Sequence, residues 1–498
     1  MSTTALVSQL PLTESFEAGY LEFNGILPLA RTDTYLRVAT CGEPALEVLD
    51  DLEREFGLPL ELVTVSRDDL VDGIRRAFAA AETIVELVKD LDAEGRAAAV
   101  ANDDPLADAR DLANQPPVIR YVNLLIKEAH EARASDIHLE STRRGLRARL
   151  RVDGVLADAP TPPPQLQAAI VSRVKLLADL DIAERRAAQD GRFRIRLESR
   201  ELDLRVATVP TLYGESVVLR LLDRGGQPVS LDDLGMAPQT LDRFQRLAAR
   251  PTGIILAAGP TGSGKTTTLY GALALRDATA EKLITVEDPV EYHLEGVTQV
   301  PVNRKSGVTF AGALRSILRQ DPDVLMIGEM RDPETAAIAI QAAMTGHLVF
   351  STLHTNDATS AVTRLLDLQV APYQIAATLE GVLAQRLVRR ICPDCREDYR
   401  PEPQVVALVS GRPAGARVLV RGRGCDACRH TGYRGRIGLF ELVVVTEDLN
   451  RAIAKPEPLA RLREIAEQEG MQTLKQDGWV KVQAGITTVE EVLRVTER

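Results

Sequence analysis

Long apolar runs are missing from this sequence. No stretch approaches the ~18 to 20 consecutive apolar residues that a helix needs to cross a bilayer. The first residues, Met1-Ser-Thr-Thr-Ala-Leu, also lack a basic stretch followed by an apolar core, so no signal peptide is expected. These absences predict a cytoplasmic protein that contacts a membrane through a partner or a surface.

An excess of basic charge is missing as well. The chain holds 60 lysine and arginine residues against 71 aspartate and glutamate residues, a formal net charge of −11. A protein that coats nucleic acid usually presents a basic face, so we expect no nucleic-acid partner. Internal repeats and low-complexity tracts are absent too, and 498 residues are too many for one compact core. The chain is therefore expected to form two to four domains.

The apolar patterns predict α/β domains joined by polar segments. The first part combines two strand-like stretches with an amphipathic helix that Gly57 ends. A helix and short alternating strands follow, and buried apolar strands then alternate with helices, as a parallel sheet demands. The pair Gly225-Gly226 is expected to form a flexible joint. We expect an N-terminal domain, a proline-bearing linker, a second domain and a C-terminal domain at residues 1–100, 101–116, 117–224 and 225–498.

A glycine-rich loop follows the apolar strand at residues 253–258. It matches the P-loop pattern G-x-x-x-x-G-K-[ST] completely, and a helix is expected from Lys265 to Leu275. Glycines let backbone N–H groups surround phosphates, Lys265 would reach the β- and γ-phosphates, and Thr266 would bind Mg²⁺. A glycine-rich turn that binds nothing is the alternative, which the flanking strand and helix disfavour. The predicted nucleotide-binding residues here are Gly259, Pro260, Thr261, Gly262, Ser263, Gly264, Lys265, Thr266 and Thr267.

Two acidic segments follow apolar strands further along the chain. The first carries Glu287, Asp288 and Glu291, and the second places Glu329 at the end of its strand. Ligands of an open parallel sheet lie at that end of the strands. We therefore expect Glu329 to orient or deprotonate the attacking water, with Glu291 as the next candidate, and Glu287 and Asp288 to line the nucleotide site. Taken singly, each acid could instead be a surface residue or a helix cap.

Two histidines are further candidates for the predicted phosphate site, and one aspartate that is common in such sites is absent. His347 and His354 flank another apolar strand, and a neutral histidine there could donate a hydrogen bond to the γ-phosphate or to the acids. Either could also be a core histidine with its hydrogen bonds satisfied. Gly328 stands where many P-loop enzymes carry a metal-linked aspartate. The Mg²⁺ shell is therefore expected to rest on Thr266, water and another acid.

Cysteine is scarce, yet four of the five cysteines form two Cys-x-x-Cys pairs. Cys392 pairs with Cys395, and Cys425 pairs with Cys428. Two such pairs complete a tetrahedral Zn²⁺ shell with no open position, so we expect a structural metal. A redox dithiol or unligated thiols are the alternative. Cys41 stands alone in an apolar stretch and is expected to be a core residue.

These motifs together resemble the secretion ATPases of the type II secretion and type IV pilus superfamily, and most of all the general secretory pathway E family. The resemblance covers nearly the whole chain. Beyond the P-loop, the histidine segment ending at His354 and the cysteine pairs, it includes residues 133–140, 149–154, 286–291 and 328–332. It implies a multidomain α/β fold with a RecA-like C-terminal ATPase core, a PAS-like second domain and a small N-terminal domain.

The resemblance also implies a mode of action. It implies a homo-hexameric ring in which arginines of the second domain, Arg205 and Arg220 by motif position, reach the phosphates. The N-terminal domain would dock onto the cytoplasmic domain of an inner-membrane partner, and a membrane platform protein would be a further partner. The chain would thus be a peripheral protein of the inner membrane that uses ATP and Mg²⁺ and carries Zn²⁺.

The implied function is hydrolysis of ATP to power pseudopilus assembly and export of folded proteins by a type II secretion system. The same engine could instead drive type IV pilus assembly or DNA uptake. A nucleotide-gated scaffold that hardly turns over is disfavoured by Glu291 and Glu329. A nucleic-acid translocase is disfavoured by the acidic balance of the chain.

Overall fold

The chain divides into two compact units. Short segments aside, the first unit covers the residues up to Leu221 and the second covers the remainder. The predicted joint at Gly225-Gly226 lies outside the described residues. The computed structural model describes residues 18–31, 35–42, 44–79, 112–197, 200–223, 229–303, 306–411 and 418–497. In these ranges, no helix combines the length and the apolar character that crossing a membrane requires.

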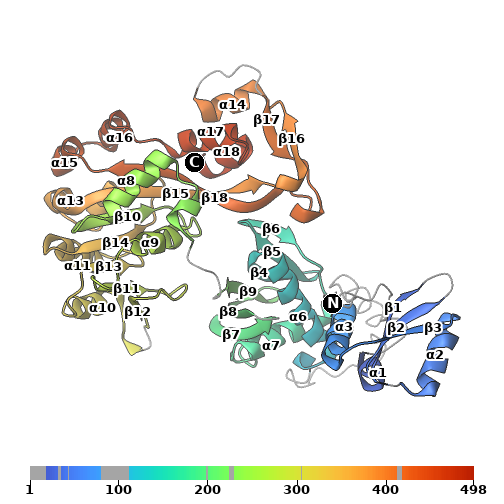
Figure 1. Ribbon diagram of the computed structural model, residues 1–498. Helices are drawn as coiled ribbons and strands as arrows, with labels where there is room; N and C mark the ends of the chain where they lie inside the picture. Colours follow the sequence, from blue (N-terminus) through green and yellow to red (C-terminus); the bar gives the residue numbers. More distant parts are fainter. Residues whose placement is uncertain are drawn as a thin grey trace. The chain divides into compact units, whose positions relative to one another are not determined.

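The N-terminal part of the first unit is a three-stranded sheet of order β1-β2-β3 (Figure 1). β1 runs antiparallel to β2, while β3 is parallel to β2 because a helix returns the chain between them. That helix buries Val48 and Leu52 and ends at Gly57, whose φ of 65° suits glycine. Cys41 lies half-buried at the rim of this small core. The elements are α1 (Ala18–Asn24), β1 (Ile26–Arg31), β2 (Leu36–Thr40), α2 (Leu46–Phe56), β3 (Leu60–Thr64) and α3 (Arg67–Ala79).

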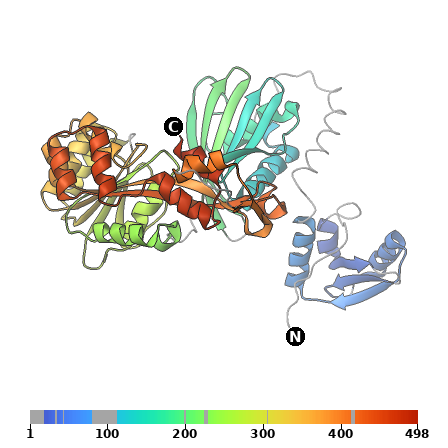
Figure 2. The same cartoon turned by 90° about the horizontal axis from the view of Figure 1, so that it is seen from above.

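A six-stranded sheet of order β6-β5-β4-β9-β8-β7 forms the rest of the first unit (Figure 2). Helix α6 begins at Pro116, within the expected linker, because proline needs no hydrogen bond in the first helical turn. Residues 101–111 of that linker lie outside the described part. The elements are α6 (Pro116–Glu131), β4 (Ala134–Thr142), β5 (Gly145–Val152), β6 (Val155–Asp158), η2 (Pro164–Leu166), α7 (Gln167–Leu177), β7 (Gln189–Leu197), β8 (Arg200–Thr211) and β9 (Gly214–Asp223).

The second unit is built on a seven-stranded sheet of order β12-β11-β13-β14-β10-β15-β18. Every printed pairing in it is parallel except that of β15 with β18. Its strands are β10 (Gly253–Ala258), β11 (Leu283–Glu287), β12 (Val297–Pro301), β13 (Val324–Ile327), β14 (Leu348–Leu353), β15 (Leu379–Ile391) and β18 (Tyr433–Val444). The strands β10, β11, β13 and β14 lead into the predicted site and are short and buried along their whole length, as parallel strands covered by helices are.

Helices cover both faces of this sheet. Along β10, Ile254 and Leu256 enter one core, which is covered by α10, α11, α12, α13, α15 and α16. The alternate residues Ile255 and Ala257 enter the other core, under α8 and α9. The covering elements are η3 (Leu231–Leu234), α8 (Pro238–Ala248), α9 (Lys265–Leu273), α10 (Phe310–Ile317), α11 (Pro333–Met344), α12 (Ser360–Asp367), α13 (Pro372–Thr378), α15 (Glu447–Ala454) and α16 (Leu459–Gln468).

A smaller C-terminal lobe packs on the far ends of β15 and β18. Val388 and Leu439 from these strands share a separate core with α14, β17, α17 and α18. The cysteine pairs lie beside it, on two one-turn 3-10 helices. The elements are η5 (Pro393–Cys395), β16 (Arg396–Tyr399), α14 (Pro403–Ser410), β17 (Leu419–Gly422), η6 (Asp426–Cys428), α17 (Leu474–Gln483) and α18 (Val489–Thr496).

A buried ion pair inside the six-stranded unit gives a stability prediction. Lys175 Nζ lies 2.7 Å from Glu215 Oε1 and donates to Glu184 O at 2.6 Å, and both charged side chains are almost fully buried. Lys175→Met leaves the Glu215 carboxylate unpaired, which we expect to cost about 3–5 kcal/mol of local stability. Hydrogen exchange of peptides across α7 and β9 measures this loss.

The matched control for that variant is an exposed pair in the same sheet. Arg147 and Asp158 lie 2.8 Å apart and are each half or more exposed, so Arg147→Met should leave exchange protection close to that of the parent. Equal exchange protection in the two variants would contradict the prediction.

Candidate active site and metal centre

The P-loop connects the C-terminal end of β10 to helix α9. No side chain fits at the first and last glycines of the loop. A Cβ on Gly259 would lie 2.6 Å from Gln385 O, and a Cβ on Gly264 would lie 2.8 Å from Gln385 Nε2. Both glycines also have positive φ, 149° and 88°. The loop is tied to the neighbouring strand by a hydrogen bond from Gly259 N to Leu353 O. The helix ends at Leu273, two residues before the expected end.

The loop is shaped to hold an anion. Lys265 is buried and its Nζ donates to Gly259 O at 2.8 Å and to Pro260 O at 2.9 Å. Ser263 Oγ is buried without a hydrogen-bond partner among the described residues, so it can donate to a phosphate oxygen. Among the other predicted loop residues, Thr261 and Gly262 are exposed, and Thr266 and Thr267 are half-buried in the first turn of α9.

Glu329 lies at the same edge of the sheet, just after β13. Its carboxylate is largely buried. Arg331 Nε lies 2.6 Å from Glu329 Oε2, and His354 Nε2 lies 3.5 Å from the same oxygen. Burial lowers the pKa of Lys265 to about 8, with Arg386 adding to the shift and Glu329 opposing it. Burial and the positive charge of Lys265 likewise lower the pKa of His354, while Glu329 acts to raise it. The imidazole is therefore neutral near pH 7, so it can either donate or accept a hydrogen bond.

The acidic segment after β11 reaches this edge too, but its members differ. Glu287 is buried, and both of its carboxylate oxygens accept hydrogen bonds from side chains of the sheet and of α9. Asp288 is exposed to solvent. Glu291 is half-buried, with its backbone N–H directed at the hydroxyl of Tyr270. Of the three, Asp288 and Glu291 keep carboxylates that are not closed in by such a network.

His347 does not lie at the phosphate site, where the sequence had predicted it. It precedes β14, and the parallel register pairs Leu348 with Gly253 and Leu353 with Ala258. The P-loop follows Ala258, so His347 lies at the opposite edge of the sheet, roughly 20 Å away by the length of a six-residue strand. Its ring is half-buried, and its Nδ1 contacts Ala342 O at 2.8 Å, five residues earlier in the chain. Within this chain His354 therefore faces the P-loop edge, and His347 does not.

The loop after His354 is anchored by residues that the motifs did not single out. Arg386 donates to Asn356 O at 3.0 Å, Glu441 accepts from Ala358 N at 2.8 Å, and Arg463 pairs with Asp357 at 2.8 Å. Gln385, beside Arg386, accepts from the Thr268 hydroxyl of α9 at 2.7 Å. One sequence signal was available, since Gln385-Arg386 is a polar pair inside the apolar stretch at residues 381–388.

The two predicted arginines belong to the six-stranded unit. Arg205 is half-buried on β8. Arg220 is exposed on β9, where its Nε donates to Asp136 Oδ1 at 3.0 Å. Asp136 lies on β4 directly opposite Arg220 in the antiparallel register. Cross-strand pairing thus fixes where Arg220 projects from its sheet.

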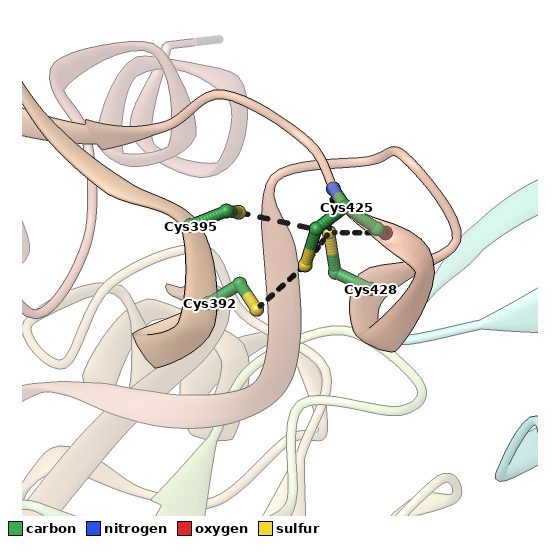
Figure 3. Close-up of side chains that lie close together, drawn as sticks. All are labelled: Cys392, Cys395, Cys425 and Cys428. Atoms are coloured by element: carbon green, nitrogen blue, oxygen red, sulfur yellow. Dashed lines mark hydrogen bonds between the residues drawn. The ribbon is translucent and has the colours of Figure 1, made fainter.

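The four predicted cysteines converge on one point (Figure 3). Their Sγ atoms are separated by 3.9 Å for Cys392 and Cys425, 3.8 Å for Cys395 and Cys428, and 3.7 Å for Cys425 and Cys428. Metal–sulfur bonds of about 2.3 Å in a tetrahedron give sulfur edges of about 3.8 Å, so the set fits zinc. Burial opposes ionisation of Cys428, but the N–H groups of Cys425 and Gly432 donate to its sulfur and lower the pKa of Cys428 to about 6. A thiolate is the form that binds a metal.

The chain matches known protein families over most of its length. Residues 111–494 match the Type II/IV secretion system protein family, and residues 3–84 match the MshEN domain. The chain belongs to the type II/IV secretion system protein family. It is 45% identical over 495 residues to the Type II secretion system protein E of Xanthomonas campestris pv. campestris, covering 98% of this chain and 86% of the relative. It is 42% identical over 459 residues to the Type II secretion system ATPase E of Vibrio cholerae, covering 91% and 90%.

Solved structures agree on the fold of this family member. The pilus retraction motor PilT with bound ADP is 26% identical, with a TM-score of 0.50 over 75% of this chain and 96% of PilT. The ATPase DotB of Legionella pneumophila is 20% identical, with a TM-score of 0.56 over 76% and 95%, and shows the fold alone. The expectation of a RecA-like α/β secretion ATPase fold is confirmed.

Nucleotide binding should be linked to proton uptake above pH 8. With its pKa near 8, Lys265 is increasingly neutral as the pH rises past that value, and bound phosphates restore its charge. We expect uptake of roughly half a proton or more per nucleotide at pH 9, and little at pH 7. Titration calorimetry at both pH values, in two buffers with different ionisation enthalpies, measures it. Binding with the same proton count at pH 7 and pH 9 would contradict this assignment of Lys265.

Zinc should be present at about one ion per chain. Cys392→Ser removes one ligand, so we expect loss of the metal and faster proteolysis between residues 392 and 428. Elemental analysis and limited proteolysis give the two readouts. Cys41→Ser, which lies in the other unit, is the control and should keep the metal. A metal-free Cys392→Ser chain that is as protected as the parent would overturn a structural role for the ion.

Proposed function

We propose that the chain is the ATP-hydrolysing motor of a type II secretion system, powering pseudopilus assembly and the export of folded proteins. The observation that carries the proposal is the placement of Glu329. Its carboxylate shares the sheet edge with the P-loop, interacts electrostatically with Lys265, and lies 3.5 Å from His354. A phosphate-binding loop with an acid beside it suits hydrolysis, whereas binding alone needs only the loop.

ATP fits the P-loop through the groups described above. The backbone of residues 259–264 would surround the phosphates, and Lys265 would move its hydrogen bonds from Gly259 O and Pro260 O to phosphate oxygens. The hydroxyl of Thr266 would hold Mg²⁺, which neutralises charge on the β- and γ-phosphates. Asp288 is exposed and follows β11 directly, at the sheet edge that carries the P-loop, so it would join the metal's water shell.

Glu329 would orient the attacking water and accept its proton, with Glu291 as the second acid. Arg331 and His354 both contact Oε2 of Glu329, which within the described part of the chain leaves Oε1 to accept from water. His354 in its neutral form would donate to the γ-phosphate or to Glu329. Its loop is fixed by Arg386 and Glu441, so the imidazole is positioned before the nucleotide arrives.

Arg205 and Arg220 would supply positive charge from the six-stranded unit to the phosphates. A guanidinium is suited to this because it is always charged and presents a forked set of donors. We expect a homo-hexameric ring with head-to-tail contacts, in which these arginines complete the site. An isolated chain would then turn over slowly.

Residues 1–100 would dock onto the cytoplasmic domain of an inner-membrane partner, with a membrane platform protein as the further contact. The chain would thereby lie at the cytoplasmic face of the inner membrane as a peripheral protein. The tetracysteine centre would hold structural zinc, since four thiolates leave no position for substrate.

The second candidate is the same engine in type IV pilus assembly or DNA uptake, and the fold shared with PilT, a pilus retraction motor, favours a pilus machine. Both candidates share the chemistry, so the test must separate the machines as well as hydrolysis from binding. A chromosomal Glu329→Gln replacement does both, because the variant keeps the P-loop but loses the acid. We expect ATP binding to persist, turnover to fall at least about 100-fold, and secreted enzymes to vanish from the medium while pili remain.

Glu295→Gln is the matched control, since it removes an exposed carboxylate from the same unit. It should export and hydrolyse like the parent. Equal turnover in the parent and in Glu329→Gln would favour a nucleotide-gated scaffold. Loss of pili or of DNA uptake with export intact would move the chain to the pilus branch.

A further inference from the structure

Helix α9 carries a buried tyrosine on the same face as the predicted metal residue. Tyr270 follows Thr266 by four residues, which is one helical turn, and it is fully buried. Its hydroxyl donates a hydrogen bond to Glu287 Oε2, at the end of β11. The helix that begins with Lys265 is therefore bonded directly to the strand that leads into the acidic segment.

The carboxylate of Glu287 is held inside this contact. Its other oxygen, Oε1, accepts from the Thr285 hydroxyl at 2.6 Å and from Gln299 Nε2 at 3.2 Å. Thr285 lies on β11 itself, and Gln299 lies on the adjacent strand β12. Three donors from three elements thus fix one buried carboxylate, and such a network is costly to leave partly unsatisfied.

The same hydroxyl also accepts hydrogen bonds. The backbone N–H of Glu291 lies 3.4 Å from Tyr270 Oη, and Gln299 Nε2 lies 3.4 Å from it. Gln299 Nε2 has two N–H groups for three acceptors, which are Tyr270 Oη, Glu287 Oε1 and Tyr292 O at 3.1 Å, so the bond that Tyr270 accepts without such competition comes from Glu291 N. Burial and the Glu287 carboxylate raise the pKa of Tyr270, which keeps the phenol protonated as a donor.

We propose that Tyr270 is a positioning residue for hydrolysis: its hydroxyl couples the phosphate-binding helix to the segment that presents Glu291 to the reaction. Glu287 acts in this arrangement through Tyr270, as the acceptor that aims the phenol, and its oxygens are not available to a metal. The inference rests on the proposed ATPase function. A displacement of α9 on phosphate binding moves the Glu291 backbone with it, and displacements of about 1 Å are enough to change rates strongly.

Tyr270→Phe is the test, because it removes one oxygen and keeps the ring. Tyr292→Phe is a matched control: its ring packs edge-on against Tyr270 at a centroid distance of 4.6 Å, and its buried hydroxyl has no hydrogen-bond partner among the described residues. We expect Tyr270→Phe to lower kcat about tenfold or more with KM for ATP changed less than about twofold, and Tyr292→Phe to match the parent. Steady-state ATPase assays of the full chain, with Lys265→Ala as the blank, give both constants.

A double-mutant cycle with Glu287→Gln separates positioning from general stability. If the two residues act as one unit, the double variant should turn over within about twofold of the slower single variant. Thermal unfolding of each variant is measured alongside, and assays are run well below the lowest transition. A merely structural tyrosine would lower the unfolding temperature and leave kcat per folded chain unchanged.

The outcomes are distinct from those of the proposed function. A parent chain that does not exceed the Lys265→Ala blank overturns the ATPase proposal and this inference with it. An active parent with equal kcat in Tyr270→Phe and Tyr292→Phe overturns the inference alone. Multiplicative losses in the Tyr270→Phe and Glu287→Gln cycle would also overturn it, since the two side chains would then act independently.

Discussion

The parallel pairing of four short strands is the constraint on which the site depends. β10, β11, β13 and β14 run in the same direction with aligned registers, so their carboxyl ends meet at one edge of the sheet. The P-loop, Glu291, Glu329 and His354 each follow one of these ends. Because parallel strands need crossover helices between them, the two apolar cores above and below the sheet hold that alignment in place.

Opposite charges lie side by side at this edge of the sheet. The buried ammonium of Lys265 is accommodated by two loop carbonyls and by the field of Glu329, which opposes the effect of burial on its pKa. Glu329 is in turn paired with Arg331. Phosphates would replace carbonyls that are already oriented toward Lys265. A site of this kind needs little rearrangement to bind, which is the advantage of preorganised electrostatics.

The C-terminal lobe contributes to the site through contacts that are distant in sequence. Arg386 bonds Asn356 on one side and Val495 O, near the end of α18, at 3.3 Å on the other. Glu441 accepts from Ala358 N and lies on β18, the strand that also supports the lobe. The cysteine cluster has its own small buried centre beside these strands. The loop after His354 is thus held by the same strands that flank the cysteine cluster.

Features encoded in contiguous residues could be predicted from the sequence. The P-loop, the acids after apolar strands and the two cysteine pairs each depend on local spacing, and local spacing fixes which groups share a turn or a strand end. The sheet edge itself followed from the α/β alternation. His347 and His354 show the limit of this reasoning, because flanking a strand places two residues at opposite edges and not side by side.

Other parts of the site were decided by tertiary structure alone. Tyr270 meets Glu287 and Gln299, and Gln385 meets Thr268, only because helices and strands distant in sequence pack together. The four thiols reach tetrahedral spacing because β15 and β18 bring the two pairs together. A single sequence states which side chains are available, whereas their partners depend on register and packing, which many residues set jointly. The sequence therefore determined the chemistry that this protein can perform, and the fold determined which neighbours hold each group in place.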